Sequence, residues 1–354
     1  MKIITLDYYP VAMKLSTPYT IAYETIDQTV NIFLRLKTRS GITGFGCAAP
    51  DPAVTGESPQ SVMSALESIK DRFLIGKDPL RIAKIQEELK KKIGTQPSLR
   101  AAIDMALYDI VGKIARAPLW KLLGGFRSRI MTSVTIGILP VRETLERARS
   151  YIKEGYVSLK IKGGLNVDED IERMIRIREA SGPRIQLRFD ANQGYSVEDA
   201  VKFVTAVKTV RIELLEQPTP KGQPEHLGRV TENVPIPIMA DESLMDLRDA
   251  YWLAKHDLVD MVNVKLMKVG GIYEALHINS VARAANLEVM VGCMDESRLA
   301  IAAGLHFALA RPNVKYADLD GHLDLIGDPA RGGFNLKRGY MYPLTAPGLG
   351  ISLD

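Results

Sequence analysis

Charged residues end a series of short apolar runs at nearly constant intervals, and this spacing constrains the fold more than any other feature. The charges are Lys162, Asp190, Glu216, Asp241, Lys265 and Asp318. They are separated by 28, 26, 25 and 24 residues and then by 53, which is about two further units. A strand with its following helix occupies roughly that length, so each charge falls once per unit at the carboxyl end of a strand.

Eight short apolar runs carry this pattern. They are Ser133–Ile136, Ser158–Ile161, Ile185–Phe189, Ile212–Leu215, Ile236–Ala240, Met261–Val264, Leu287–Val291 and Val314–Ala317. Their alternation with helical patterns predicts parallel strands, either in a (β/α) barrel or in a doubly wound sheet. The repeated charges favour the barrel, because all its strands end at one mouth. We therefore predict the α/β class, with a modified (β/α)8 TIM-type barrel.

The first part of the chain has a different pattern. Lys2–Tyr9 and Val30–Cys47 alternate apolar and polar side chains, which predicts a small antiparallel sheet. Helical patterns follow over Ser58–Phe73, Leu80–Lys92 and Ser98–Ala115. We expect an α+β capping domain over residues 1–125 and the barrel over residues 126–330. Residues 331–354 are turn-rich and are expected to fold back onto the capping domain.

Composition excludes several classes of protein. The chain is 46% hydrophobic and 25% charged, as globular proteins are. Its formal charge is only +4 and its longest basic run is Lys90–Lys92, so neither nucleic acid nor a membrane surface is an expected partner. Two cysteines, Cys47 and Cys293, make no disulfide framework. Without a signal-peptide pattern or a long apolar stretch, we expect a cytoplasmic protein.

Three of the strand-end charges are carboxylates, Asp190, Glu216 and Asp241. Converging carboxylates repel one another unless a cation neutralises them, and an all-oxygen set suits one Mg²⁺. The five histidines are scattered and show no zinc spacing. Lys160 and Lys162 lie two residues apart on a strand, so they share a face. Their mutual repulsion favours a neutral amine that can act as a base near pH 7.

Five ordered motifs resemble the enolase superfamily, muconate-lactonising-enzyme subgroup, although they do not separate the activities within that subgroup. The motifs are Lys160-Ile161-Lys162, Asp190-Ala191-Asn192, Glu216-Gln217-Pro218, Ala240-Asp241-Glu242-Ser243 and Asn263–Gly271. The resemblance covers essentially the whole chain. It implies that Asp190, Glu216 and Asp241 bind Mg²⁺ and that Lys162 and Lys265 are the catalytic bases.

The same resemblance gives two other lysines lesser roles. Lys160 is expected to tune Lys162 or to contact the substrate carboxylate, and Lys268 is expected to be structural or to support a neighbouring residue of the site. A carboxylate bound to Mg²⁺ has an acidified α-carbon, and the metal stabilises the developing enediolate. Lysines on its two faces permit a 1,1-proton transfer, so the implied enzyme is a racemase or epimerase of amino acid derivatives.

Ala317-Asp318-Leu319-Asp320, at the end of the eighth strand, narrows the substrate class. Its two aspartates share a face because they are two residues apart. In dipeptide epimerases such an Asp-x-Asp holds the free α-ammonium of the substrate, so the resemblance implies a dipeptide. Two alternatives remain: a solvated acidic turn, and an N-acylamino acid racemase or o-succinylbenzoate synthase, in which Asp318 and Asp320 would have no cation to bind.

Capping-domain loops around Tyr19–Ile26 and Cys47–Glu57 are expected to close over the mouth. Where Ala-Glu epimerases carry an arginine, this sequence has Glu24. Asp51 and Asp295 add negative charge to the same region, so we predict a dipeptide with a cationic second residue such as Lys or Arg. If Glu24 is instead an exposed rim charge, a hydrophobic second residue is expected.

Other readings remain for the site and its partners. Thr135 points into the mouth by register and is a further predicted substrate contact. A metal- or peptide-binding protein without activity would lack Lys162 or Lys265. An acid-sugar dehydratase would carry a histidine after a late strand, where this chain has Lys265 and Cys293. As partners we expect a small dipeptide substrate and further copies of this chain in a homo-oligomer.

Overall fold

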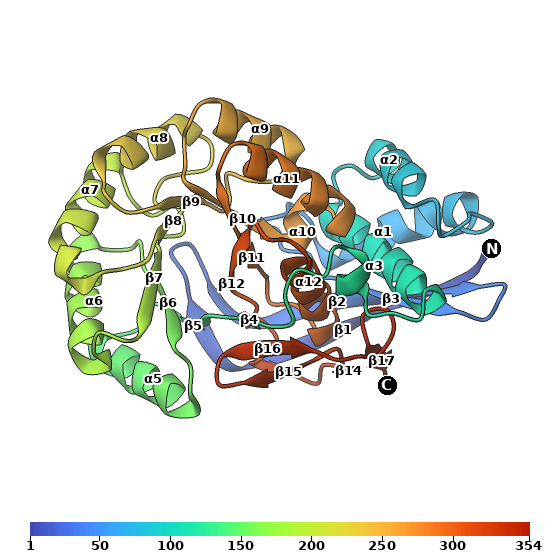
Figure 1. The fold of residues 1–354 in the computed structure, drawn as a ribbon, viewed down its shortest axis with the longest axis horizontal. Helices are drawn as coiled ribbons and strands as arrows, with labels where there is room; N and C mark the ends of the chain where they lie inside the picture. The colour runs from blue at the N-terminus through green and yellow to red at the C-terminus, as the bar shows by residue number, and fades with distance from the viewer.

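A computed structural model describes residues 1–354 as a barrel with a capping domain against one side (Figure 1). The barrel strands are β5 (Val134–Ile136), β6 (Ser158–Lys162), β7 (Gln186–Asp190), β8 (Leu215–Glu216), β9 (Ile238–Ala240), β10 (Met261–Lys265), β11 (Glu288–Gly292) and β12 (Val314–Ala317). They pair in parallel in sequence order. A bridge joins Thr132, two residues before β5, to Ala317 at the end of β12. The predicted barrel with its α+β capping domain is confirmed.

Crossover helices surround the barrel on its outer side. They are α5 (Val141–Glu154), α6 (Val167–Ser181), α7 (Val197–Ala206) with the short η2 (Lys208–Val210), α8 (Pro224–Asn233), α9 (Leu247–Lys255), α10 (Leu266–Val269) with α11 (Ile272–Ala284), and α12 (Arg298–Ala310). Asn166, Ser196 and Asp246 cap the first backbone N–H groups of α6, α7 and α9 with their side chains. No helix follows β12; the chain continues instead into short strands.

The capping domain has one antiparallel sheet and a layer of helices. Its elements are β1 (Ile3–Thr20), β2 (Thr25–Thr38), β3 (Thr43–Ala48), α1 (Pro59–Ile69) with the π-helical turn η1 (Lys70–Leu74), α2 (Ile82–Lys92), α3 (Pro97–Ile114) and α4 (Leu119–Leu122). The predicted helices therefore form. Helix α3 packs so closely on β3 that a Cβ atom at Gly44 or Gly46 would lie 2.1 Å or 1.9 Å from α3 carbonyl oxygens. Only glycine, which has no Cβ, fits at these two positions.

The long β1–β2 hairpin extends from the capping helices to the barrel, and its tip lies over the mouth (Figure 1). The backbone N–H of Ile138, just after β5, donates to the carbonyl of Thr20 in this tip. The capping domain also has its own apolar core, separate from that of the barrel. The hairpin is thus the part of the capping domain that reaches the strand ends.

Short strands after β12 tie the end of the chain to both domains. They are β13 (Leu325–Ile326), β14 (Ala330–Gly332), β15 (Phe334–Lys337), β16 (Tyr340–Pro343) and β17 (Ile351–Leu353), of which β13 pairs with β1 and β16 with β4 (Ile130–Met131). Gly348 bridges to Pro118 beside α4.

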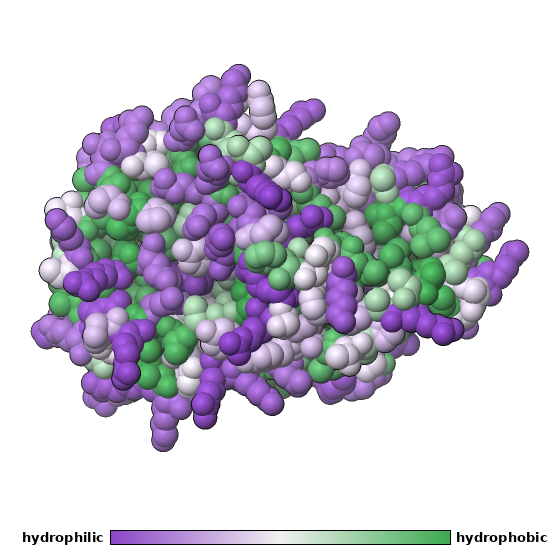
Figure 2. All heavy atoms as spheres, in the orientation of Figure 1, coloured by the Kyte–Doolittle hydropathy of each residue, from purple (hydrophilic) through white to green (hydrophobic).

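Charged and polar side chains cover much of the face seen in Figure 2. None of the helices combines the length and apolarity needed to cross a bilayer.

Candidate active site

The order of the barrel strands decides how the predicted site residues face one another. In a ring of eight strands, β6 lies opposite β10, and β8 lies opposite β12. Lys162 and Lys265 end the first pair of strands, whereas Glu216 ends β8 and Asp318 follows β12. The mouth therefore has four sides. Lys162 and Lys265 lie on two opposite sides. We call the side of Glu216 the carboxylate wall and the side of Asp318, opposite it, the Asp-x-Asp wall.

Asp190, Glu216 and Asp241 come together on the carboxylate wall. Each offers an oxygen atom, and the three atoms lie within 4.8 Å of one another. Burial and the neighbouring Asp190 raise the pKa of Glu216 to about 8. Burial opposes ionisation of Asp241 too, but Lys265 and Lys268 hold its pKa far below the usual range. A compact, buried, all-oxygen set of this kind fits a magnesium ion.

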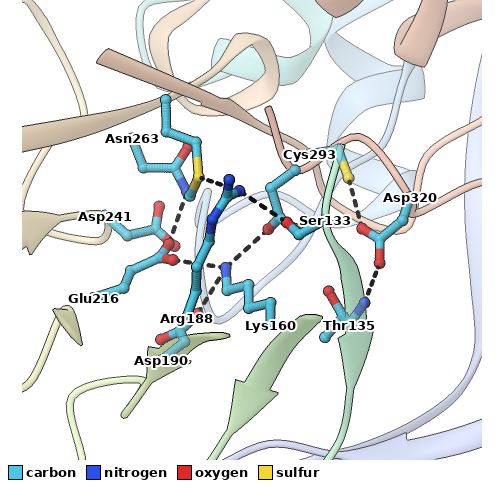
Figure 3. A network of polar contacts seen from close by, with 12 residues as sticks. Ser133, Thr135, Lys160, Arg188, Asp190, Glu216, Asp241, Asn263, Cys293 and Asp320 are labelled. Atoms are coloured by element: carbon cyan, nitrogen blue, oxygen red, sulfur yellow. Dashed lines mark hydrogen bonds and ion pairs between the residues drawn. The ribbon is translucent and has the colours of Figure 1, made fainter. Parts of the chain in front are cut away.

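Lys160 lies at the centre of the polar network in Figure 3. Its Nζ atom is 2.9 Å from Asp190 Oδ2, 2.8 Å from Glu216 Oε2 and 2.9 Å from Asp318 Oδ2. Burial lowers the pKa of Lys160, but these carboxylates together raise it well above its ordinary value. The prediction that repulsion from Lys162 lowers the pKa of Lys160 is therefore wrong, because the three carboxylate contacts have the larger effect.

The two predicted bases contact different carboxylates of the triad. Lys162 Nζ lies 2.8 Å from Asp190 Oδ2, and Lys265 Nζ lies 2.8 Å from Asp241 Oδ2. Both side chains are largely buried, and both line the same cavity. Their amines reach one space from opposite strands.

Asp318 and Asp320 lie in different environments. Asp318 accepts a 2.6 Å hydrogen bond from the Ser133 hydroxyl and pairs with Lys160, and although burial opposes ionisation, these contacts lower its pKa to about 2. Asp320 accepts a 2.6 Å hydrogen bond from the Thr135 backbone N–H and has no ion-pair partner. Burial and the charge of Asp318 raise the pKa of Asp320 to about 7. Of these two aspartates, Asp320 is therefore the one that gains more from a cation in the cavity.

One cavity of about 550 Å³ joins these walls. It is lined by the predicted residues Glu24, Asp51, Thr135, Lys160, Lys162, Lys265, Asp295, Asp318 and Asp320, while the triad carboxylates lie beside it. Tyr19 at the hairpin tip donates a 2.8 Å hydrogen bond to Asp295, so that carboxylate already has a partner. Glu24 is exposed yet lines the cavity, and burial and Asp51 raise its pKa.

Sequence reasoning missed two side chains that support the site. Glu242 is buried beside Asp241, lines the cavity and accepts a 3.2 Å hydrogen bond from Asn192. Its place within a motif was the available signal. Arg188 lies inside the barrel and donates to the Ser133 hydroxyl at 3.2 Å (Figure 3). It precedes Asp190 by two residues, so strand periodicity already directs it to the interior.

A further contact joins Lys268 to the triad. Its Nζ atom donates to both the carboxylate and the backbone carbonyl of Asp241. Lys268 thus contacts a carboxylate of the triad, as expected of a side chain that supports the residues of the site.

Two family models match the chain. Residues 143–354 match the enolase C-terminal domain-like model, and residues 3–124 match the mandelate racemase/muconate lactonizing enzyme N-terminal domain. An L-Lys-D/L-Arg epimerase of Desulforapulum autotrophicum is 42% identical over 353 residues, which cover 99% of each chain.

Solved structures of two dipeptide epimerases superpose on this fold. The enzyme from Enterococcus faecalis, complexed with Mg and the dipeptide L-Leu-L-Tyr, has a TM-score of 0.97 at 40% identity, covering 99% of this chain and 100% of that one. The enzyme from Methylococcus capsulatus, complexed with Mg and L-Arg-D-Lys, has a TM-score of 0.94 at 38% identity, covering 99% of each chain.

Proposed function

Because the chain belongs to the mandelate racemase/muconate lactonizing enzyme family of the enolase superfamily, we propose that it is a Mg²⁺-dependent dipeptide epimerase. It inverts the α-carbon of the C-terminal residue. One observation carries the proposal: Lys162 and Lys265 reach one cavity from opposite strands, between the carboxylate triad and Asp320. A carbon held there has an amine on each face.

The carboxylate and the ammonium of a dipeptide would bind on opposite sides of the mouth. Asp190, Glu216 and Asp241 would hold Mg²⁺, which, when bound, acidifies the α-hydrogen of a neighbouring carboxylate. Lys160, beside the triad, attracts the substrate carboxylate. Asp320, on the opposite wall, accepts from the substrate ammonium. The peptide thus crosses the cavity with its C-terminal α-carbon on the triad side.

The two lysines exchange the proton. In one direction Lys162 as a neutral amine removes the α-proton, and Lys265 as an ammonium delivers one to the other face. The return reaction reverses these roles. Each amine lies 2.8 Å from a carboxylate of the triad, Lys162 from Asp190 and Lys265 from Asp241, so the triad contacts both bases.

We also propose a cationic second residue, such as Lys or Arg. Glu24, Asp51 and Glu242 line the cavity, and Glu242 Oε2 has no hydrogen-bond partner within the protein. The named activity of the Desulforapulum relative supports the same preference. A hydrophobic second residue is the competing candidate, favoured by Ile21 and Val54 in the same lining.

Two assays test these proposals. Incubation with free-amine dipeptides in D₂O should exchange the α-hydrogen of the C-terminal residue, and absence of exchange across a panel would exclude an epimerase. An N-acylamino acid racemase would instead act on acylated substrates, which present no ammonium to Asp320.

The second assay tests side-chain preference. The value of kcat/KM should be highest for Ala-Lys, lower for Ala-Phe and lowest for Ala-Glu. Faster turnover of Ala-Glu would overturn the cationic preference.

A further inference from the structure

A short helical turn follows Lys265 directly and adjoins the predicted base. Helix α10 (Leu266–Val269) starts directly after Lys265 and consists of a single turn. It carries Lys268, whose Nζ atom donates to the Asp241 carboxylate. The turn therefore contacts the triad through Lys268 and adjoins the predicted base through the backbone of Lys265.

Helix α3 of the capping domain holds the end of this turn. Arg100 is buried, and its Nη2 atom donates a 2.9 Å hydrogen bond to the carbonyl of Val269, the last residue of α10. Gly270, with φ +94°, allows this close approach, because a Cβ there would lie 1.8 Å from Arg100 Nη2. A guanidinium that satisfies a helix's final carbonyl is a C-terminal cap supplied from another domain.

The next turn of α3 holds the start of α11. Asp104 is completely buried, and its Oδ2 atom accepts hydrogen bonds from the backbone N–H groups of Ile272 at 2.5 Å and Tyr273 at 3.3 Å. A Cβ at Gly271 would lie 2.5 Å from Asp104 Cβ. Arg100 and Asp104 are four residues apart and so share one face of α3. This face therefore contacts both sides of the α10–α11 junction, and we call the contacts of Arg100 and Asp104 the α3 clamp.

Lys162 is supported in a different way. Arg173 Nη1 donates to the carbonyl of Lys162 at 3.4 Å and pairs with Asp170 Oδ1 at 2.7 Å. Asp170 Oδ2 accepts a 2.8 Å hydrogen bond from the backbone N–H of Gly164. Asp170 and Arg173 both lie on α6, the helix that directly follows β6. The barrel therefore supports Lys162 from within its own strand–helix unit.

We propose that Arg100 and Asp104 are positioning residues for Lys265, so that the capping domain places one base and the barrel places the other. This inference rests on the proposed two-base epimerase. Its consequence is asymmetric: loss of the α3 clamp slows proton transfer on the face that Lys265 serves and spares the face that Lys162 serves.

The test measures α-hydrogen exchange in D₂O separately for the two epimers at the C-terminal residue. Lys265→Ala first identifies the epimer that depends on Lys265. Arg100→Met should slow exchange of that epimer by roughly tenfold or more relative to the other, since proton transfer is sensitive to misplacement by about 1 Å. The matched variant Arg173→Met should bias exchange against the opposite epimer.

Two milder variants distinguish a positioning effect from a general loss of folding. Asp104→Asn keeps the side-chain shape and one acceptor oxygen, so it should show the bias of Arg100→Met in weaker form, and Arg100→Lys should restore part of the lost rate. Equal slowing of both epimers in Arg100→Met, or the same bias in Arg173→Met, would overturn the positioning role. A native enzyme that exchanges neither epimer would instead overturn the proposed function itself.

Discussion

Lys162 and Lys265 end opposite strands of the barrel, and each ammonium lies 2.8 Å from a different carboxylate of the triad. Asp190 pairs with the first and Asp241 with the second. A substrate carbon between the two amines could be reached from either face. The proposed two-base epimerase requires this arrangement.

Asp320 should matter for substrates with a free amine. Asp320→Asn removes a charged hydrogen-bond acceptor that is worth about 1.5–3 kcal/mol, so KM for Ala-Lys should rise about tenfold to a hundredfold. Steady-state kinetics measures this. Asp324→Asn, which alters a neighbouring aspartate of the cavity lining, is the matched control and should change KM far less.

The pH dependence of KM should report the same carboxylate. Burial and Asp318 raise the pKa of Asp320 to about 7, so below that pH its neutral form predominates and attracts an ammonium weakly. KM for Ala-Lys should therefore fall as pH rises through 7, and rise again above about 8 as the substrate amine loses its proton. In Asp320→Asn the acidic limb should disappear. Its persistence would assign that limb to another group.

Glu24 and Asp51 should contribute to side-chain preference. Each lies in the cavity lining near solvent, where a charge pair is worth about 0.2–1 kcal/mol. Glu24→Gln and Asp51→Asn should each lower kcat/KM for Ala-Lys by up to about fivefold and leave Ala-Phe unchanged. Equal losses for both dipeptides would instead indicate a general effect on the loops.

The Tyr19–Asp295 hydrogen bond joins the hairpin tip to the loop after β11. Tyr19→Phe leaves a partly buried carboxylate without its donor, which costs about 1–3 kcal/mol at full burial and less here. KM should rise several-fold, because the hairpin no longer closes the cavity as firmly. Tyr151→Phe is the matched control, since Tyr151 lines the same cavity. Similar effects of both substitutions would contradict a specific role for Tyr19.

The regular spacing of strand-end charges was sufficient to predict the barrel and which residues share its mouth. Strand limits were harder to predict: β9 begins at Ile238 rather than Ile236, and β8 covers only Leu215–Glu216. Pro237 lacks the N–H that would extend pairing there. Contacts between distant segments, such as Tyr19 with Asp295, depend on how the hairpin packs over the barrel. No local pattern encodes them.

The two-base claim is tested most directly by α-hydrogen exchange in Lys162→Ala and Lys265→Ala, measured in D₂O with each epimer of Ala-Lys. Each variant should lose epimerisation by at least about a thousandfold, yet keep exchanging one epimer, and the retained epimer should differ between the two variants. Retention of the same epimer in both variants, or epimerisation that survives either substitution, would contradict the account.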